Sequence, residues 1–230
     1  MTSDRTLRKL LTALAALLLT GAAGIAEARA AIPDFTGVWE VIGNHPQLRP
    51  DTGKIPFTAA AAAAYAKTQA ATKAGDLSWD TSQMCIPTGI PRTLAVKQPF
   101  EILQEPKVVT FLFQIQRLYR YIYLDPAQPV NDDPTFMGQP FGHWDGNTLV
   151  ATSDSFKTGT FLDDEGMPHS EDLKVTERFS LKNPNVLVDR LHIEDDQTFT
   201  TGWDAELSFR RLRGVRIQED ICVERTQKKS

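Results

Sequence analysis

The sequence predicts a mostly β protein, whose antiparallel strands close into a barrel or fold over as a sandwich, with one helix near the N-terminus. Segments rich in β-branched and aromatic residues make up almost everything after residue 95. Turn sequences such as Glu105-Pro106-Lys107 and Asn183-Pro184-Asn185 separate these segments. Strands joined by short turns pair with their neighbours in sequence, so we expect a meander of about seven to nine strands.

The first strand is expected over residues 35–41, and it contains a Gly-x-Trp sequence at Gly37 and Trp39. In lipocalins and other calycin barrels, such a tryptophan starts the first strand and plugs one end of the barrel. This similarity implies an up-and-down barrel of that type, with Trp39 buried. The helix is expected next, because Thr58 can cap an alanine-rich segment that continues to a stop at Gly75.

The later strands follow the β-rich segments. We expect them over residues 100–104, 108–115, 118–124, 147–156, 173–181, 186–194, 199–209 and 215–223. The least regular stretches are residues 32–56 and 131–140, which suit lids or loops at the mouth of a barrel. The sequence contains neither an internal repeat nor a domain linker.

The first thirty residues carry the features of a signal peptide in the required order. A basic start precedes an apolar run from Leu10 to about Ile25, and Ala28-Arg29-Ala30 fits the rule for cleavage. We therefore expect a signal peptide over residues 1–30, a single domain over residues 31–230, and a periplasmic or secreted protein. No second apolar stretch follows in the sequence, so we expect no membrane span after cleavage.

Composition and charge limit the partners of the chain. Hydrophobic residues make up 41% of it and charged residues 23%, which is close to the averages of soluble globular proteins. Cleavage would remove four of the 25 basic and two of the 29 acidic residues, which leaves a net charge of −6. This balance argues against nucleic acid and anionic membrane surfaces. We expect a small-molecule partner, and the oligomeric state is open.

Two cysteines, Cys85 and Cys222, remain after the expected cleavage. In an oxidising compartment, two cysteines pair with each other more often than not. The expected disulfide is therefore Cys85–Cys222, and the alternative is a pair of separate buried thiols.

Charged residues on apolar strand faces mark a candidate site. Glu177 interrupts the apolar face of its expected strand, and a buried lone carboxylate is costly. Arg120 is the partner that we expect, because it alternates with Tyr119, Tyr121 and Tyr123 along another strand. Whichever face of that strand points inward, the interior receives either the arginine or the row of tyrosines. A Glu–Arg pair there would be a structural pair or part of a ligand site.

Three of the four histidines have an acid two residues later in the sequence, among them His143 and His169. Both fall in expected loops, where imidazole could transfer protons, and the alternative is an ordinary surface histidine. No His-x-His or cysteine-rich cluster supports a metal site, so we expect no metal. Glycine-rich nucleotide-binding and nucleophile-elbow motifs are also missing from the sequence, and we expect no cofactor.

Four motifs between about residues 80 and 205 resemble those of a large, mostly uncharacterised family of secreted bacterial proteins. They are Cys85-Ile-Pro-Thr-Gly-Ile-Pro-Arg92, Gly142-His-Trp-Asp-Gly-Asn-Thr-Leu-Val150, Leu162-Asp-Asp-Glu-Gly-Met-Pro-His-Ser170 and Val175-Thr-Glu-Arg-Phe179. The resemblance implies a β-rich, lipocalin-like domain. It draws attention to Arg92, His169, Ser170, Glu177 and Arg178.

In its general features the chain also resembles small lyases of sphingomonad-like bacteria that act on lignin-derived aromatic compounds. Small barrel-shaped phenolic acid decarboxylases use interior Tyr, Arg and Glu side chains without a cofactor. The analogy is one of fold and implies a cofactor-independent lyase that breaks a carbon–carbon bond of a phenolic molecule in the barrel cavity. In this first hypothesis, Tyr121 with Tyr119 or Tyr123 would hold the phenolate.

The remaining roles in this hypothesis fall to charged residues and histidines. Arg120 or Arg92 would bind an anionic group, and Glu177 with His169 or His143 would move the proton. The second hypothesis is a binding or carrier barrel that has the same cavity and no turnover. A third is a structural envelope protein.

Overall fold

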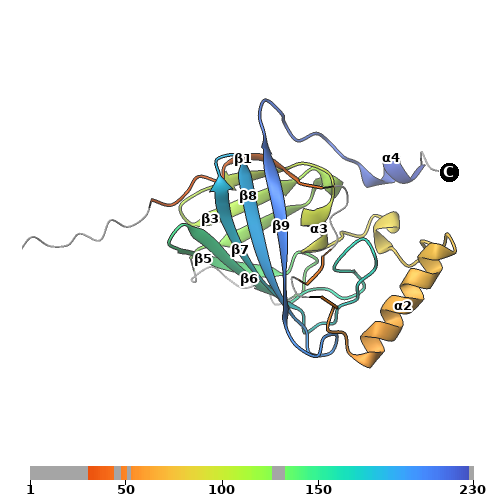
Figure 1. Ribbon diagram of the computed structural model, residues 1–230. Coiled ribbons are helices and arrows are strands. Elements are labelled where there is room, and N and C mark those ends of the chain that lie inside the picture. Colours follow the sequence, from red (N-terminus) through yellow and green to blue (C-terminus); the bar gives the residue numbers. More distant parts are fainter. Residues whose placement is uncertain (1–30, 44–47, 51–52, 126–132, 228–230) are drawn as a thin grey trace, which may run out of the picture. The chain divides into compact units, whose positions relative to one another are not determined.

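The computed structural model describes residues 31–43, 48–50, 53–125 and 133–227, and the expected signal peptide lies outside these residues. Nine strands of the described chain form a closed barrel in sequence order, with the ninth pairing back to the first (Figure 1). They are β1 Gly37–Val41, β2 Phe100–Gln104, β3 Val108–Phe113, β4 Tyr119–Tyr123, β5 Gln139–Asp145, β6 Thr148–Asp154, β7 Lys174–Asn183, β8 Val186–Glu194 and β9 Trp203–Leu212. The prediction of a mostly β meander is confirmed, and the barrel is the correct alternative. One detail is corrected: β4 and β5 pair in parallel, whereas all strands were expected to be antiparallel.

The expected helix is present as α2, Ala59–Lys73. Thr58 caps it, since its side chain accepts a hydrogen bond from the amide of Ala61. The helix ends before Gly75, whose φ of 82° lies in the left-handed region that favours glycine. Shorter helical pieces are η1 Thr81–Met84, α3 Arg92–Ala95, η2 Ile115–Arg117 and α4 Cys222–Gln227. None of the described helices combines the length and hydrophobicity needed to cross a bilayer.

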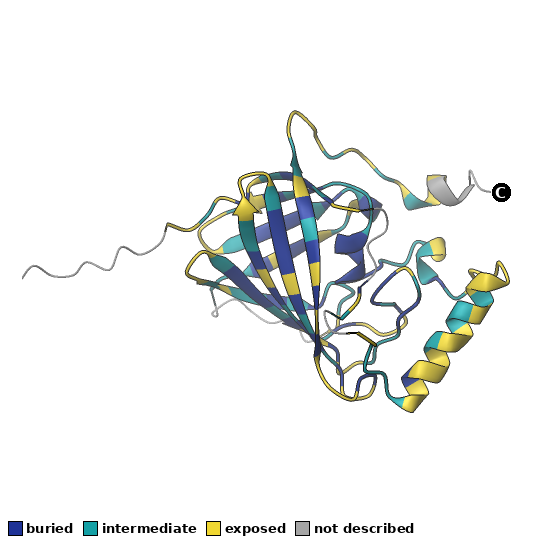
Figure 2. Cartoon of the chain, viewed as in Figure 1, coloured by how far each residue is buried: buried dark blue, intermediate teal, exposed yellow. Residues whose placement is uncertain are grey.

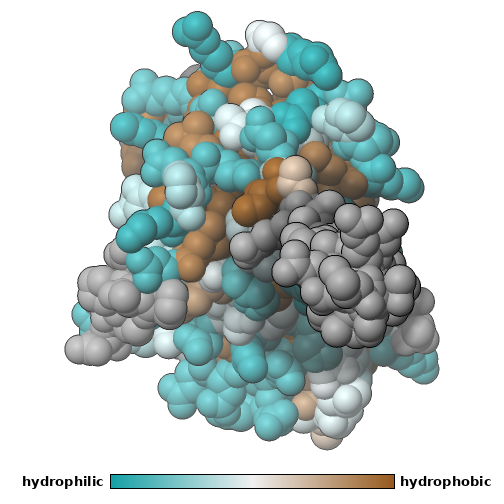
Figure 3. All heavy atoms as spheres, turned by 90° about the vertical axis from the view of Figure 1, so that its left-hand side faces the viewer, coloured by the Kyte–Doolittle hydropathy of each residue, from teal (hydrophilic) through white to brown (hydrophobic). Residues whose placement is uncertain are grey.

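Aromatic side chains fill much of the barrel. Buried residues alternate with exposed ones along the strands, as the period of two in a β-strand requires (Figure 2). Phe100 lies 5.2 to 5.8 Å from the rings of Phe111, Phe113 and Phe209. On the outer surface, hydrophobic patches lie among hydrophilic residues on the side that Figure 3 displays.

Trp39 is completely buried on β1, as the sequence predicts. Its indole N–H donates a hydrogen bond of 2.8 Å to the carbonyl of Phe35. The guanidinium of Arg211, from β9, lies 4.2 Å from the centre of the indole ring. The tryptophan therefore joins the two strands at which the barrel closes.

The structure corrects three strand predictions. β5 was missed, because Pro140 and Gly142 are residues that strands usually avoid. The strand expected over 199–209 begins at Trp203, and the segment 215–223 forms no strand. The last segment has nothing to pair with, because β9 already pairs with both β8 and β1.

The disulfide between Cys85 and Cys222 is confirmed, with 5.6 Å between the two Cα atoms. It joins the end of η1 to α4, whereas Cys222 was expected in a strand. The same C-terminal segment contacts η2, where the backbone amide of Gln116 donates to the carboxylate of Asp220. The bridge therefore holds the C-terminal segment against the turn before β4.

Candidate functional site

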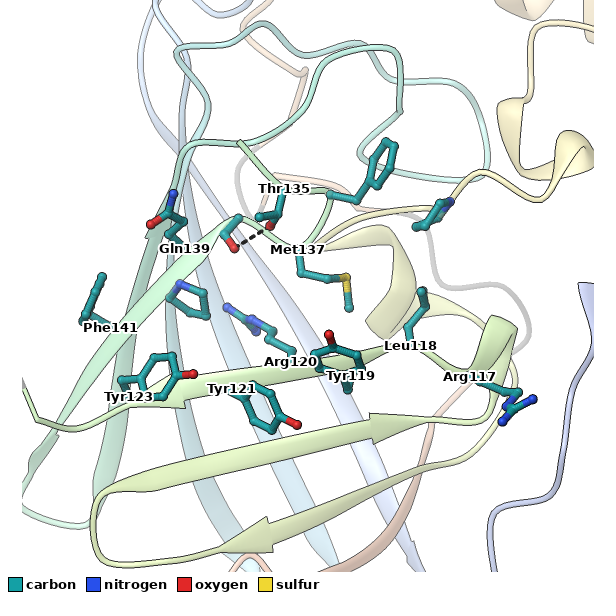
Figure 4. Close-up of a pocket in the computed structure, with 14 residues that line it drawn as sticks. Arg117, Leu118, Tyr119, Arg120, Tyr121, Tyr123, Thr135, Met137, Gln139 and Phe141 are labelled. Atoms are coloured by element: carbon teal, nitrogen blue, oxygen red, sulfur yellow. Dashed lines mark hydrogen bonds between the residues drawn. The ribbon is translucent and has the colours of Figure 1, made fainter. Parts of the chain in front are cut away.

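A pocket of about 420 Å³ lies where β4 and β5 diverge (Figure 4). In the described barrel, these two strands share one register pair, Tyr123 with Phe141, whereas every other pair of neighbours shares three or more. Pro140 is tolerated in β5 for the same reason, because a residue without an N–H suits a sparsely paired edge. The gap in the ladder is what opens the pocket.

The three tyrosines of β4 form one wall of this pocket. Their rings lie 5.1 Å and 6.2 Å apart in sequence order, and the row continues to Phe141 at 6.4 Å. Tyr119 is 59% exposed and Tyr121 is 40% exposed, so the row lies on the outer face of the barrel. The prediction that Tyr119, Tyr121 and Tyr123 line a cavity inside the barrel is therefore corrected: they line a pocket on its outer side.

The opposite wall comes from the segment that precedes β5. Phe136 and Met137 line the pocket there, within the stretch that was expected to form a mouth loop. The hydroxyl of Thr135 donates a 2.8 Å hydrogen bond to the carbonyl of Gly138 (Figure 4). Gly138 has a φ of 68°, and a Cβ there would lie 2.6 Å from the ring of Phe156. A glycine is therefore required to seat this wall against the end of β6.

Only positive charges line the pocket among the described residues. The 14 lining residues include Arg117 and Arg120 and no carboxylate. The side chain of Arg117 is 64% exposed and forms a 3.3 Å ion pair with Glu219, which does not itself line the pocket. A negatively charged group is therefore favoured near Arg117.

Arg120 points away from the tyrosines, into the barrel (Figure 4). Its guanidinium binds both carboxylate oxygens of Glu177 on β7, one of them at 2.8 Å, and donates to the hydroxyl of Ser153 at 2.8 Å. Neither side chain of this ion pair is exposed. The expected partnership of Glu177 with Arg120 is confirmed. The Nε of Arg120 has no hydrogen-bond partner among the described residues.

A second buried carboxylate, that of Asp189 on β8, lies near this pair. Burial raises its pKa well above the usual 3.8, and the charge of Glu177 raises it further, while Arg120 acts in the opposite direction. The backbone N–H of Arg178 also acts to lower the pKa, but neither oxygen of Asp189 has a partner in hydrogen-bond geometry within the described chain. Asp189 is therefore held as the neutral acid.

Sequence reasoning overlooked Asp189, although the signal was present. It lies between Leu187 and Leu191 on the apolar face of its strand, in the same way that Glu177 interrupts the face of β7. The pocket residues Arg117 and Met137 had no comparable signal, because they belong to irregular segments.

Neither candidate histidine reaches Glu177. His143 lies on the exposed face of β5 and does not line the pocket. His169 is largely buried, and burial lowers its pKa. Its Nδ1 donates to the carbonyl of Ser170 at 2.9 Å and its Nε2 accepts from Thr160 at 2.8 Å. Both ring nitrogens of His169 are engaged in hydrogen bonds, and these bonds hold the loop that contains it in place.

Two further residues highlighted by the family resemblance form ion pairs elsewhere. Arg92 is buried and bonds to both carboxylate oxygens of Asp80 at 2.9 Å, with Asp164 at 2.7 Å from its Nε. Arg178 pairs with Asp145 on the outer surface. Within the part of the chain that the structure describes, no group of three His, Cys, Asp or Glu side chains could hold a metal ion.

No family model matches the chain, and no curated protein does. Among solved structures, the chain is similar to the crystal structure of a mutant of the fluorescent protein UnaG. The two are 12% identical, the match covers 77% of this chain and 96% of the other, and the TM-score is 0.37. A likeness of this size carries no argument about ligand or activity.

Proposed function

We propose that the protein binds a small aromatic acid in the pocket between β4 and β5, as a carrier or binding protein. The observation that supports this most directly is the combination of an aromatic wall with lining charges of one sign. A volume of about 420 Å³ falls within the range of small-molecule sites. A flat ring would pack on the faces of Tyr121 and Tyr123, because aromatic rings favour offset or edge contacts.

The acidic group of this ligand would be placed by Arg117. Arg117 offers a guanidinium at the rim, and its exposed pair with Glu219 is weak enough to exchange. The guanidinium of Arg120 lies behind the wall of tyrosines, buried and paired with Glu177, so Arg117 is the arginine that a ligand on the outer side can reach. A binding site of this kind needs no group that changes its protonation.

Titration calorimetry with 4-hydroxycinnamate tests the proposal, with the amine tyramine as the probe of opposite charge. We expect saturable binding of the acid and much weaker binding of the amine. Tyr121→Ala should weaken binding by about tenfold, since it removes the central ring of the wall. His143→Ala is the matched control on β5 and should change nothing. If the acid does not bind, or if Tyr121→Ala binds it equally well, the pocket is not its site.

Lyase activity on a phenolic substrate is a second proposal. Support for it comes from the buried carboxylate of Asp189, whose pKa burial raises, close to the ion pair of Arg120 with Glu177, since a buried group with a shifted pKa is typical of catalytic sites. Incubation of 4-hydroxycinnamates and phenolic dimers with the purified protein, followed by mass detection, tests it. A product that Glu177→Gln no longer forms, with the fold retained, would support turnover. If the wild-type protein leaves these phenolic compounds unchanged, the lyase proposal is refuted and only the binding proposal remains.

A further inference from the structure

We infer that the ligand of the pocket between β4 and β5 is a short peptide that ends in an aromatic residue and binds along the open edge of β4 as an added strand. This inference rests on the proposed function, since it names the class of aromatic acid that the same pocket takes. Its basis is the main chain of β4, which the proposed function does not use. A strand edge without a partner is a template for an extended chain.

The backbone groups of β4 point alternately to its two sides, and two hydrogen bonds show which residues face β3. The amide of Phe113 donates to the carbonyl of Leu118 at 2.8 Å. The amide of Leu124 donates to the carbonyl of Lys107, also at 2.8 Å. In an antiparallel pair, every second residue exchanges hydrogen bonds with the partner strand. The even-numbered residues of β4 therefore bond to β3, and the odd-numbered ones direct their backbone N–H and C=O groups toward β5.

Two of the odd-numbered residues, Tyr119 and Tyr121, form an open edge. The third, Tyr123, is the residue of β4 that is in register with β5, opposite Phe141. On this side, neither a strand nor a loop of the described chain bonds to the backbone of the other two. Each of them has one N–H donor and one C=O acceptor. The edge therefore offers four main-chain hydrogen bonds to an extended guest, and both residues line the pocket (Figure 4).

Charge determines the direction of the guest along this edge. Arg117 directly precedes β4 and lines the pocket at the end nearest Tyr119 (Figure 4). A terminal carboxylate placed there can accept from the guanidinium and from the amide of Tyr119. The C-terminus of the guest then lies at the start of β4, so the guest runs antiparallel to this strand. No carboxylate lines the pocket in the described chain, so the acidic end meets no opposing charge.

The alternation of side chains then specifies the residues of the guest. Guest residues opposite Tyr119 and Tyr121 project on the same outer face as the tyrosine rings, where aromatic side chains can pack against them. The guest residue between these two projects to the inner side of β4, which carries Arg120 and Ile122. These two side chains are buried, so the interior beside them is filled and a small residue is required. The expected pattern is an aromatic residue, a small residue, and an aromatic residue with a free carboxylate.

The peptide N-acetyl-Phe-Gly-Phe, with a free carboxylate, is the probe for titration calorimetry with the purified protein. It should bind at least about tenfold more tightly than 4-hydroxycinnamate, because it adds main-chain hydrogen bonds. Methylation of the last amide nitrogen removes the donor to the carbonyl of Tyr119 and should weaken binding by about tenfold. Methylation of the glycine nitrogen, which points away from β4, is the matched control and should retain most of the affinity. Equal losses from both methylations, or no loss from either, would overturn the inference.

Hydrogen exchange tests the open edge in the protein itself. Without ligand, the amides of Tyr119 and Tyr121 should exchange faster than those of Arg120 and Ile122, and the peptide should slow them at least about tenfold. If 4-hydroxycinnamate binds and the peptide adds no protection here, the inference is wrong and the proposed function stands. If the peptide protects these amides but 4-hydroxycinnamate does not bind, the peptide site stands and the wider proposal for small aromatic acids fails.

Discussion

Inside the barrel, one guanidinium lies near two carboxylates and forms hydrogen bonds with only one of them. Glu177 takes the hydrogen bonds of Arg120, while Asp189 remains without a partner. A second negative charge in the same dry interior would be repelled by Glu177 and poorly solvated. The neutral state of Asp189 is therefore a consequence first of its burial and second of the bidentate Arg120–Glu177 pair.

Asp189→Asn should stabilise the protein at neutral and alkaline pH, by on the order of 1 kcal/mol or more. The raised pKa means that folded Asp189 keeps a proton that the unfolded chain releases above its usual value of 3.8. The free energy of unfolding of the wild type therefore falls as the pH rises above this usual value. The uncharged side chain of the Asn variant does not titrate, so the variant does not show this loss. Urea unfolding between pH 4 and pH 8 measures it. The two proteins should converge near pH 4, and a constant difference across the range would contradict the assignment.

Glu177→Gln should lower the free energy of unfolding. The loss should be smaller than the value of about 3–5 kcal/mol that is typical when one partner of a buried ion pair is removed. The reason is that Asp189 can then ionise and become the counter-charge of Arg120. In this background, Asp189→Asn should destabilise the protein, which reverses the sign of its effect in the wild type. Unfolding curves of both single variants and the double variant provide the test. Additive effects would show that the two carboxylates do not compete for Arg120.

Among the helices and strands, the sequence predicted correctly those whose residue pattern is compatible with only one type of secondary structure. α2 and most strands follow from a capped alanine run and from β-branched segments between turns. β5 could not be predicted, because Pro140 suits a strand only beside the gap at β4, and a gap is a property of the closed barrel. The segment 215–223 has β-like residues, but pairing requires a free edge that the barrel does not offer.

The same limit applies to the candidate site. The pairing of Glu177 with Arg120 could be predicted, because a carboxylate on an apolar face demands a cation. The position of the tyrosines could not, since Arg120 and the tyrosines alternate on one strand and only its partner strands determine which face is inside. The pocket itself depends on irregular residues such as Met137, for which no periodicity exists.

Removal of the disulfide tests how the C-terminal segment is held. The bridge spans 137 residues, and chain entropy gives about 4–5 kcal/mol for a loop of this length. The double variant Cys85→Ser and Cys222→Ser should lose less than this, because the freed segment also gains entropy in the folded protein. Hydrogen exchange should quicken at Gln116 and Gln218, whose amides donate to Asp220 and Gln114, while the amides of β7 and β8 stay protected. If protection were lost throughout the barrel, the disulfide would be stabilising the whole domain and not only the C-terminal segment.

For the molecule as a whole, η2 contributes both to the candidate site and to a second pocket, which has a volume of about 360 Å³ and lies among η1, α3 and η2. Arg117 lines the candidate site and Gln116 lines the second pocket, and both residues have left-handed backbone angles that cost energy outside glycine. The C-terminal segment contacts both, through Asp220 and Glu219. Formation of the disulfide is therefore expected to help shape both pockets, which makes the compartment in which the protein folds relevant to its function.

We predict that the protein is exported from the cytosol and that its signal peptide is removed. The basic start, the apolar run and Ala28-Arg29-Ala30 predict cleavage after Ala30, and the barrel begins after this point, at Gly37. Protein from the native host should have Ala31 as its first residue by mass spectrometry, and thiol reagents should label neither cysteine after denaturation without reductant. The chain that starts at Ala31, produced in a reducing cytosol, is the control and should carry two reactive thiols until it is oxidised. Native protein that retains Met1 would refute export, whereas free thiols on a processed chain would refute the disulfide alone.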